Sequence, residues 1–291
     1  MSRFHHTSWR TLLFPVLSCL LGSVLRSVSS ETPVDPSQPL LWSYDTVAEY
    51  PHDPNAFTQG LTFDRECSDS SQQCFDVFWE STGLNGRSSV RQVDANTGQV
   101  LMRQDLSCRA LCRGARPHRQ DAVPADVADF KGAALSHAGM ASSGLKDGWG
   151  LAFDGVHLLA TESSAQVHWL DPQSLAVVKS LTVTDRGQPI KWLNELEVID
   201  GELWANIWQR ECIARIDLST GKVVGWVLLH GLREAMLKRR RRDGQVDVLN
   251  GRIFVTGKLW PSIFEIRLKP VEAPKHKQAL DSIPSLCWPP S

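Results

Sequence analysis

The stretch FDVFWESTGLNGRSSVRQVDANTGQV, residues 75–100, shows how this chain folds locally. Its first part alternates apolar and polar side chains, the period of a half-buried strand, and ends at Glu80, a lone carboxylate where an apolar or turn residue was due. Residues 81–83 form a turn, residues 89–94 alternate again, and residues 96–98 have the Asn-Thr-Gly composition of a hairpin turn. The stretch therefore predicts a β-meander with an acid at a strand end.

The second half of the chain repeats this unit. Residues 157–171, 202–217 and 252–266 each contain a strand pattern, a polar turn and a second strand that ends at or near an acid. Repeats of roughly 40 to 50 residues with four strands each are typical of β-propellers. The sequence therefore predicts an all-β fold of the propeller type.

Residues 103–146 differ from their surroundings. Arginines such as Arg109, Arg113, Arg116 and Arg119 alternate irregularly with Ala, Pro and Cys, and no alternating strand pattern is present. We expect an atypical insertion here, in place of most of one strand unit. A disordered insertion, a stretch outside the native reading frame and a basic binding arm are the explanations that stay open.

The N-terminus has the pattern of a targeting segment. Arg3 and Arg10 precede or flank the start of an apolar run at 12–25, and small residues follow up to Ser30. This pattern predicts a secretory signal peptide at residues 1–30, and hence a secreted or endomembrane-lumen protein. A signal anchor is the alternative, although about 15 apolar residues are fewer than the roughly 20 that span a bilayer.

The expected organisation continues from this segment. A Pro-rich leader at 31–41 is followed by the propeller domain at 42–268 and a C-terminal tail at 269–291. Residues 43–50 have the pattern of an edge strand, and the prolines and Asx residues of 51–55 predict a loop.

Charge and cysteines limit the possible partners. The net charge is -1 and the pI is about 6.8, so nothing in the global charge indicates nucleic acid, and we expect a monomer without stable membrane insertion after signal cleavage. Apart from Cys19 the cysteines form an even set, which suits disulfides in a secreted chain. Cys67 and Cys74 bracket a polar hairpin tip, and this is the one pair that we predict. Cys108 and Cys112 could be metal ligands, but a Cys-x3-Cys spacing without a matching second pair is a weak signal. A disulfide or two free thiols is favoured for them.

Candidate functional residues are isolated polar groups beside aromatic ones. Catalytic serine elbows, phosphate loops, zinc motifs and dinucleotide fingerprints are missing from the sequence. The candidates are Phe57, Gln59, Glu80, Trp149, Asn194, Trp208 and Lys258. Each has a structural alternative, because tryptophans commonly pack in cores and polar groups at hairpins are commonly exposed or ion-paired.

Several long motifs carry a resemblance to a known family. They are YPHDPNAFTQGL (50–61), ESTGL (80–84), GRSSVR (86–91), GWGL (148–151), LNELE (193–197), ANIW (205–208), VLNG (248–251) and FVTGKLW (254–260). In this order, over about 44–102 and 147–268, they resemble the plant-type (type I) glutaminyl cyclases, also called glutaminyl-peptide cyclotransferases.

The resemblance implies a fold and a reaction. The family is a five-bladed β-propeller, unrelated to the zinc-dependent animal enzymes, and converts N-terminal glutamine of peptides and proteins to pyroglutamate with release of ammonia. The reaction needs no metal or other cofactor.

The resemblance also implies roles for the candidate residues. Glu80 would carry a proton from the attacking amine to the leaving nitrogen, and Asn194 and Lys258 would hold the amide oxygen and its developing charge. Gln59 would bind the substrate N-terminus or backbone, while Phe57, Trp149 and Trp208 would form the pocket wall. On this mechanism Glu80→Gln should abolish cyclisation and leave the fold intact.

The chain also departs from the family pattern. Residues 103–146 lack two strand motifs, Asn85 replaces a usual Tyr, and Val248–Gly251 runs directly into the next strand. One blade is therefore expected to be degenerate. Two rival functions remain: an inactive propeller that binds peptides or proteins, and a propeller lactonase or esterase with an axial calcium, for which the candidate ligands are Glu80, Glu162, Glu197 and Asn206.

Overall fold

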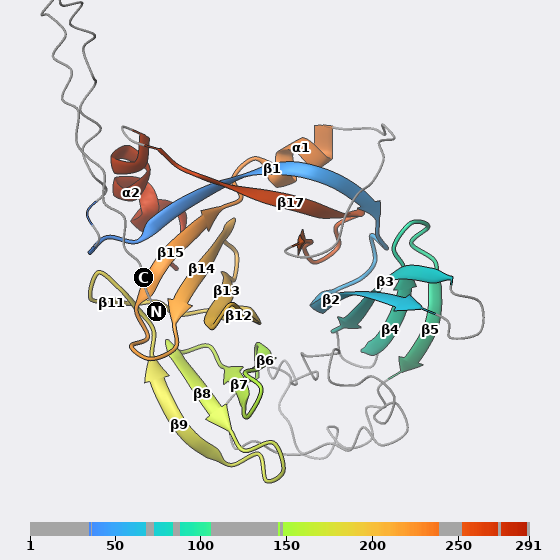
Figure 1. The fold of residues 1–291 in the computed structure, drawn as a ribbon, viewed down its shortest axis with the longest axis horizontal. Helices are drawn as coiled ribbons and strands as arrows, with labels where there is room; N and C mark the ends of the chain where they lie inside the picture. The colour runs from blue at the N-terminus through green and yellow to red at the C-terminus, as the bar shows by residue number, and fades with distance from the viewer. Residues whose placement is uncertain are drawn as a thin grey trace, which may run out of the picture. The chain divides into compact units, whose positions relative to one another are not determined.

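The computed structural model describes residues 35, 37–67, 73–83, 88–105, 145, 148–238, 252–272 and 275–289 (Figure 1). All of them belong to the compact unit Pro33–Ser291. The expected signal peptide, Cys108 and Cys112, and most of the atypical segment 103–146 lie outside the described residues.

The described chain is mostly β-structure, and it contains three consecutive runs of four antiparallel strands. Within each run, neighbouring strands are also neighbours in the sequence, as expected for meanders; two runs are separate sheets and the third is part of a sheet of seven strands. The first sheet contains β2 (Thr58–Cys67), β3 (Cys74–Thr82), β4 (Ser89–Asp94) and β5 (Val100–Asp105), and the second contains β6 (Leu151–Phe153), β7 (Leu158–Thr161), β8 (Gln166–Leu170) and β9 (Val177–Thr182). The third run is β12 (Leu193–Ile199), β13 (Glu202–Ile207), β14 (Cys212–Asp217) and β15 (Val223–Leu228). A small hairpin is formed by β10 (Thr184–Asp185) and β11 (Gln188–Pro189), and two helices are α1 (Leu232–Lys238) and α2 (Lys275–Leu286).

The long strand β1 (Leu40–Pro51) joins the third run to the end of the chain. It pairs in parallel with β15 through Leu40 to Trp42, and antiparallel with β17 (Ser262–Pro270) over almost its whole length. β16 (Ile253–Val255) then pairs with β17, which completes a sheet of seven strands. Residues 43–50, predicted as an edge strand, pair with β17, and among the described strands β15 meets only the residues before them, Leu40 to Trp42.

The predicted meander at 75–100 is confirmed by β3, β4 and β5, but the turn predicted at 81–83 was wrong in its start, because β3 continues past Glu80 through Ser81 and Thr82, which pair with β2 and β4. Glu80 pairs directly with Arg91 across β3 and β4. At the predicted hairpin turn, Gly98 has a φ of 71° and its N–H donates to the carbonyl of Asp94 at 2.8 Å. Glycine adopts this left-handed backbone without steric cost, which is why the turn forms here.

An aromatic cluster holds the first sheet against β1 and β16. The ring of Phe78 on β3 lies 5.7 Å from the rings of both Tyr50 and Phe63 and 5.1 Å from the ring of Phe254, all in edge-to-face contacts. Phe78 is 1% exposed. Edge-to-face ring pairs add to the free energy of burial, so this cluster fixes β3 relative to β1 and β16.

The C-terminal segment is attached to β14 by a disulfide and to the small hairpin by a hydrogen bond. Cys287, just after α2, forms a disulfide with Cys212 on β14, and the indole N–H of Trp288 donates to Oδ2 of Asp185 on β10 at 2.9 Å. No sequence pattern indicated α2 or this disulfide in residues 269–291, which were expected as a tail.

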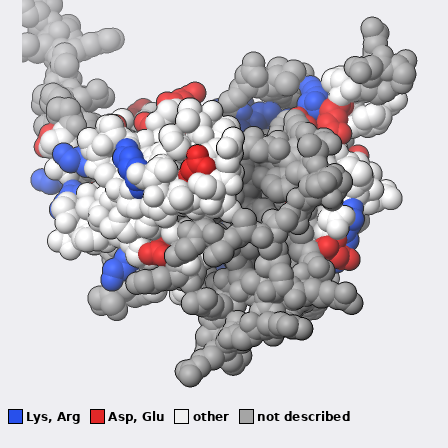
Figure 2. Space-filling view, turned by 90° about the horizontal axis from the view of Figure 1, so that it is seen from below, with Lys and Arg blue, Asp and Glu red and all other residues white. Residues whose placement is uncertain are grey.

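The predicted Cys67–Cys74 disulfide is confirmed. Together with Cys212–Cys287 it suits a protein of an oxidising compartment. No helix among the described residues is long and apolar enough to cross a bilayer. On the face in Figure 2, the described acidic and basic side chains are scattered among other residues, in keeping with a net charge of -1.

Candidate active site

Glu80 is the centre of a buried network of charges and hydrogen bonds. It is 1% exposed, and its Oε1 lies 2.9 Å from Nε2 of His52 and accepts a hydrogen bond from the Thr58 hydroxyl at 2.6 Å. Oε2 accepts a hydrogen bond from Nε of Arg91 at 2.7 Å. Arg91 in turn donates to Asp53 at 2.9 Å. The carboxylate is therefore held from both oxygens, and it is not the lone acid that the sequence suggested.

Opposing effects act on the pKa of Glu80. Burial raises it, because a charged group is disfavoured away from water, while the hydrogen bond and charge of His52 and the charge of Arg91 lower it. The lowering effects win, so the pKa lies below its ordinary value of 4.5. Glu80 is consequently a stable carboxylate at neutral pH.

Strand geometry explains how these groups meet. In the antiparallel pairing, Glu80 on β3 faces Arg91 on β4 and Leu61 on β2, and directly paired residues have their side chains on the same face. The register between β2 and β3 shifts between Thr58 and Gly60. Such bulges re-aim side chains next to active sites, and this one lies at Gln59.

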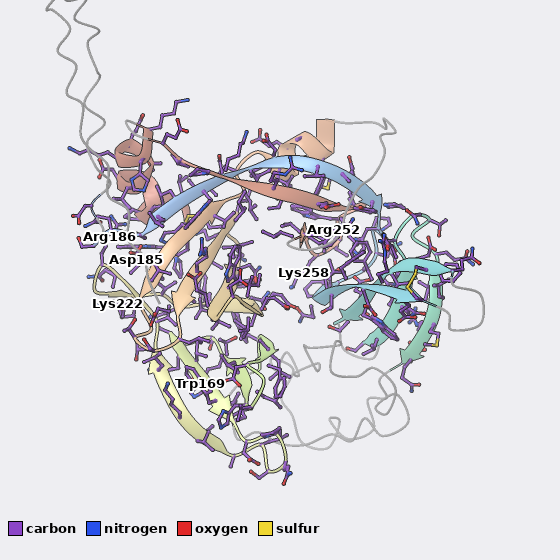
Figure 3. All side chains as sticks on the ribbon, in the orientation of Figure 1. Trp169, Asp185, Arg186, Lys222, Arg252 and Lys258 are labelled. Carbon is purple, nitrogen blue, oxygen red and sulfur yellow. A yellow bond between two sulfur atoms is a disulfide. The ribbon has the colours of Figure 1, made fainter. Side chains whose placement is uncertain are left out.

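Gln59 and Lys258 lie beside this network. A Cβ on Gly83 would lie only 3.0 Å from Cγ of Gln59, so the glycine allows the Gln59 side chain to lie close to the end of β3. Within the described residues, the buried Oε1 of Gln59 has no hydrogen-bond partner. Lys258 donates from Nζ to the carbonyl of Thr58 at 3.0 Å, and Nζ lies 5.3 Å from the ring centroid of Phe57 (Figure 3).

The pKa of Lys258 is lowered from its ordinary value of 10.5. Burial lowers it by disfavouring the ammonium, and the negative charge of Glu195 opposes this effect. Glu195 directly follows Asn194, so this interaction connects the Lys258 loop electrostatically to the start of β12.

A second group of predicted residues surrounds the ring of Trp208. The centroid of this ring lies 5.4 Å from the ring centroids of both Trp149 and Trp192, in edge-to-face contacts. The backbone N–H of Trp208 donates to the carbonyl of Trp192 at 2.9 Å. Asn194 is 7% exposed. A Cβ on Gly150 would lie 1.7 Å from the carbonyl oxygen of Asn194, so only glycine allows this close approach of the two backbones.

Three of the six described non-glycine residues with left-handed backbone lie in this region, and the other three are Leu175, Arg186 and Asp200. Trp192, Gln209 and Leu259 have φ values of 65°, 61° and 64°, and each lies within two residues of a predicted site residue. A side chain in this conformation costs free energy and persists only where the surroundings fix it. Residues held in this way concentrate at functional sites.

The seven predicted residues therefore fall into two groups. Phe57, Gln59, Glu80 and Lys258 meet around the end of β3, and Trp149, Asn194 and Trp208 meet around the start of β12. The sequence prediction missed the roles of His52, Thr58, Arg91 and Trp192. Arg91 was accessible to prediction, because it alternates on the strand that follows Glu80, whereas His52 comes from a loop whose path only the folded chain shows.

Metal binding gains no support from the described part of the chain. No group of three or more His, Cys, Asp and Glu side chains there is placed to hold an ion. Of the candidate calcium ligands, Glu80 is paired with His52 and Arg91, and Oε1 of Glu162 lies 3.9 Å from His168.

Comparison with known proteins decides the family. The profile of the glutamine cyclotransferases matches residues 16–268. The chain belongs to the glutamine cyclotransferase family. A glutaminyl-peptide cyclotransferase of Arabidopsis thaliana is 38% identical over 249 residues, which are 79% of this chain and 72% of the relative. The crystal structure of the Myxococcus xanthus glutaminyl cyclase is similar with a TM-score of 0.58 and 26% identity, over 81% of this chain and 100% of that one.

Membership in the glutamine cyclotransferase family confirms the resemblance noted in the sequence. The match extends across all three four-stranded runs and the strands β1, β16 and β17. Both groups of candidate residues lie within it.

Proposed function

We propose that this chain is a glutaminyl-peptide cyclotransferase that converts the N-terminal glutamine of peptides and proteins to pyroglutamate and ammonia. Family membership supports this activity. The observation that carries the mechanism is the buried carboxylate of Glu80, with Gln59 and Lys258 beside it.

The reaction requires one proton to move twice. The neutral α-amine attacks the γ-carboxamide carbon, the carbonyl becomes an oxyanion, and the leaving nitrogen departs as ammonia. Oε1 of Glu80 accepts hydrogen bonds from two groups and Oε2 from one, so Oε2 keeps a free lone pair. Glu80 takes the amine proton at Oε2 and returns it to the leaving nitrogen, as general base and then general acid.

The other predicted residues bind and orient the glutamine. Lys258 and Asn194 hold the amide oxygen and stabilise its developing charge. Gln59 accepts a hydrogen bond from the substrate amine or backbone through Oε1, which is buried without a partner within the described residues. Phe57, Trp149 and Trp208 form the wall that folds the glutamine for attack.

The proposed organisation is a five-bladed β-propeller at 42–268, with the degenerate blade at 103–146. The three four-stranded runs supply three blades, and β1, β16 and β17 supply another. Residues 1–30 are proposed as a cleaved signal peptide and the residues between 30 and β1 as a leader, shorter than the expected 31–41 because β1 begins at Leu40. This gives a secreted or lumenal monomer.

Ammonia release tests the activity. The purified full chain is incubated with a Gln-initial dipeptide, with and without a metal chelator, and the matched Asn-initial dipeptide is the control. Release from the Gln peptide alone, unchanged by the chelator, is the expected result. No release from a chain that circular dichroism shows to be folded overturns the proposal and favours the peptide-binding alternative.

A further inference from the structure

His52 makes three contacts that tie two distant parts of the chain together. Its backbone N–H donates to the carbonyl of Pro261 at 2.9 Å, and its Nδ1 lies 2.6 Å from the carbonyl oxygen of Trp260. Nε2 lies 2.9 Å from Oε1 of Glu80, and the imidazole is almost completely buried. His52 therefore connects the loop that carries Lys258 to the proposed proton carrier.

Both ring nitrogens of His52 face oxygens that accept hydrogen bonds. The carbonyl oxygen of Trp260 can only accept, which suits a proton on Nδ1. Oε1 of Glu80 also accepts from Thr58, and Arg91 contacts the other carboxylate oxygen, which suits a proton on Nε2. The ring therefore lies between a carbonyl and a carboxylate.

We propose that His52 is a positioning residue for the cyclisation, which keeps Glu80 charged before attack and confines proton exchange to Oε2. This inference rests on the proposed function. The proton on Nε2 stays on His52 throughout, while the amine proton moves to Oε2 and from there to the leaving nitrogen. The bond from the amine nitrogen to the amide carbon forms, and the bond from that carbon to the leaving nitrogen breaks.

The surrounding charges agree with this role. Arg91 on β4 contacts the pair at Oε2 of Glu80, and Asp53 contacts Arg91 in turn. Arg91 contacts the oxygen that exchanges the proton, and His52 contacts the other. Loss of His52 would therefore leave Oε1 with Thr58 alone, while Arg91 still holds Oε2, and so loosen the carboxylate at the oxygen that does not exchange the proton.

Two substitutions separate positioning from a purely structural role. His52→Gln places an amide donor near the position of Nε2, toward Glu80, and loses the contact with Trp260. His52→Asn keeps a donor near the position of Nδ1, toward Trp260, and loses the contact with Glu80. We expect kcat to fall roughly 10- to 100-fold in His52→Asn and by only about threefold in His52→Gln. The acid limb of the kcat/KM profile should move to higher pH in His52→Asn, because a partner that lowers the pKa of Glu80 is lost.

The proposal is overturned if kcat falls more in His52→Gln than in His52→Asn. It is also overturned if kcat falls equally in both and the acid limb of the kcat/KM profile does not shift. Circular dichroism establishes that each variant is folded. Nitrogen-15 NMR of the wild-type His52 ring gives a test without activity: a hydrogen bond from a protonated Nε2 to Glu80 is expected, and an unprotonated Nε2 refutes the inference. If the wild-type protein releases no ammonia, the cyclase function fails, while the NMR result still decides whether His52 donates to Glu80.

Discussion

Glu80 illustrates how one residue contributes to both stability and chemistry. Its charge is buried, and its partners are Arg91 and His52. A buried pair that loses one partner leaves the other charge uncompensated, which commonly costs about 3 kcal/mol or more. We therefore expect Glu80→Gln to abolish ammonia release, by at least about 100-fold in kcat, and also to lower the free energy of unfolding by about 3 kcal/mol. The fold itself should stay intact, as expected from the sequence, at this lower stability.

Asp76→Asn is the matched control, because Asp76 lies on the same strand and pairs with Arg65 at 2.6 Å in a more exposed position. An exposed pair contributes about 1 kcal/mol or less. Steady-state kinetics and urea unfolding of both variants test the expected losses of turnover and of stability. Near wild-type turnover in Glu80→Gln contradicts the mechanism, and equal stability losses in the two variants contradict the burial argument.

The lowered pKa of Glu80 predicts the direction of acid destabilisation. The unfolded chain has the higher pKa, near 4.5, so below this value it binds more protons than the folded chain. The stabilisation by Glu80 is therefore complete above 4.5 and is lost as the pH falls through the folded-state pKa. Urea midpoints from about pH 7 to about pH 3 should fall less steeply in Glu80→Gln than in the wild type. If the urea midpoints of the two proteins fell equally steeply with pH, other carboxylates would be the cause of the loss of stability in acid.

Among the elements, α2 is the helix that a disulfide joins to the sheet, through Cys287 just after its end. The Cys212–Cys287 disulfide closes 75 residues of sequence and Cys67–Cys74 closes 7. On chain-entropy grounds the first stabilises by about 4 kcal/mol and the second by about 2 kcal/mol. We expect Cys212→Ser/Cys287→Ser to lower the thermal midpoint more than Cys67→Ser/Cys74→Ser. The reverse order in scanning calorimetry would show that α2 contributes little to the fold.

The elements also show which parts of the fold can be predicted from sequence patterns. Local alternation predicted β3 and β4, and the Asn-Thr-Gly turn predicted the hairpin before β5, because these contacts join near neighbours. The partners of β1 and the bond from Cys287 join distant parts of the chain, and periodicity contains no information about them. In the same way, motifs identified the candidate residues, whereas the contact of His52 with Glu80 depends on the folded path of a loop.

At the scale of the whole molecule, β1 is the strand that the architecture needs most. It covers edges of both β15 and β17, so its removal exposes unpaired backbone on two strands. A variant without residues 1–51 should show no cooperative thermal unfolding by circular dichroism and should aggregate on size exclusion. The matched variant without residues 1–36 keeps β1 and should unfold as the wild type does. Cooperative unfolding of the shorter chain would show that β1 is dispensable.

The same strand has a consequence for biosynthesis. β1 leaves the ribosome early, while its partners β15 and β17 follow only near the end of the chain. At a synthesis rate of about 5–20 residues per second, on the order of ten seconds pass between the synthesis of β1 and that of its first partner, β15. Throughout translation the nascent chain therefore carries an unpaired strand, and its last folding step takes place only after synthesis is nearly complete. The time that a chaperone must shield this chain is set by its own length.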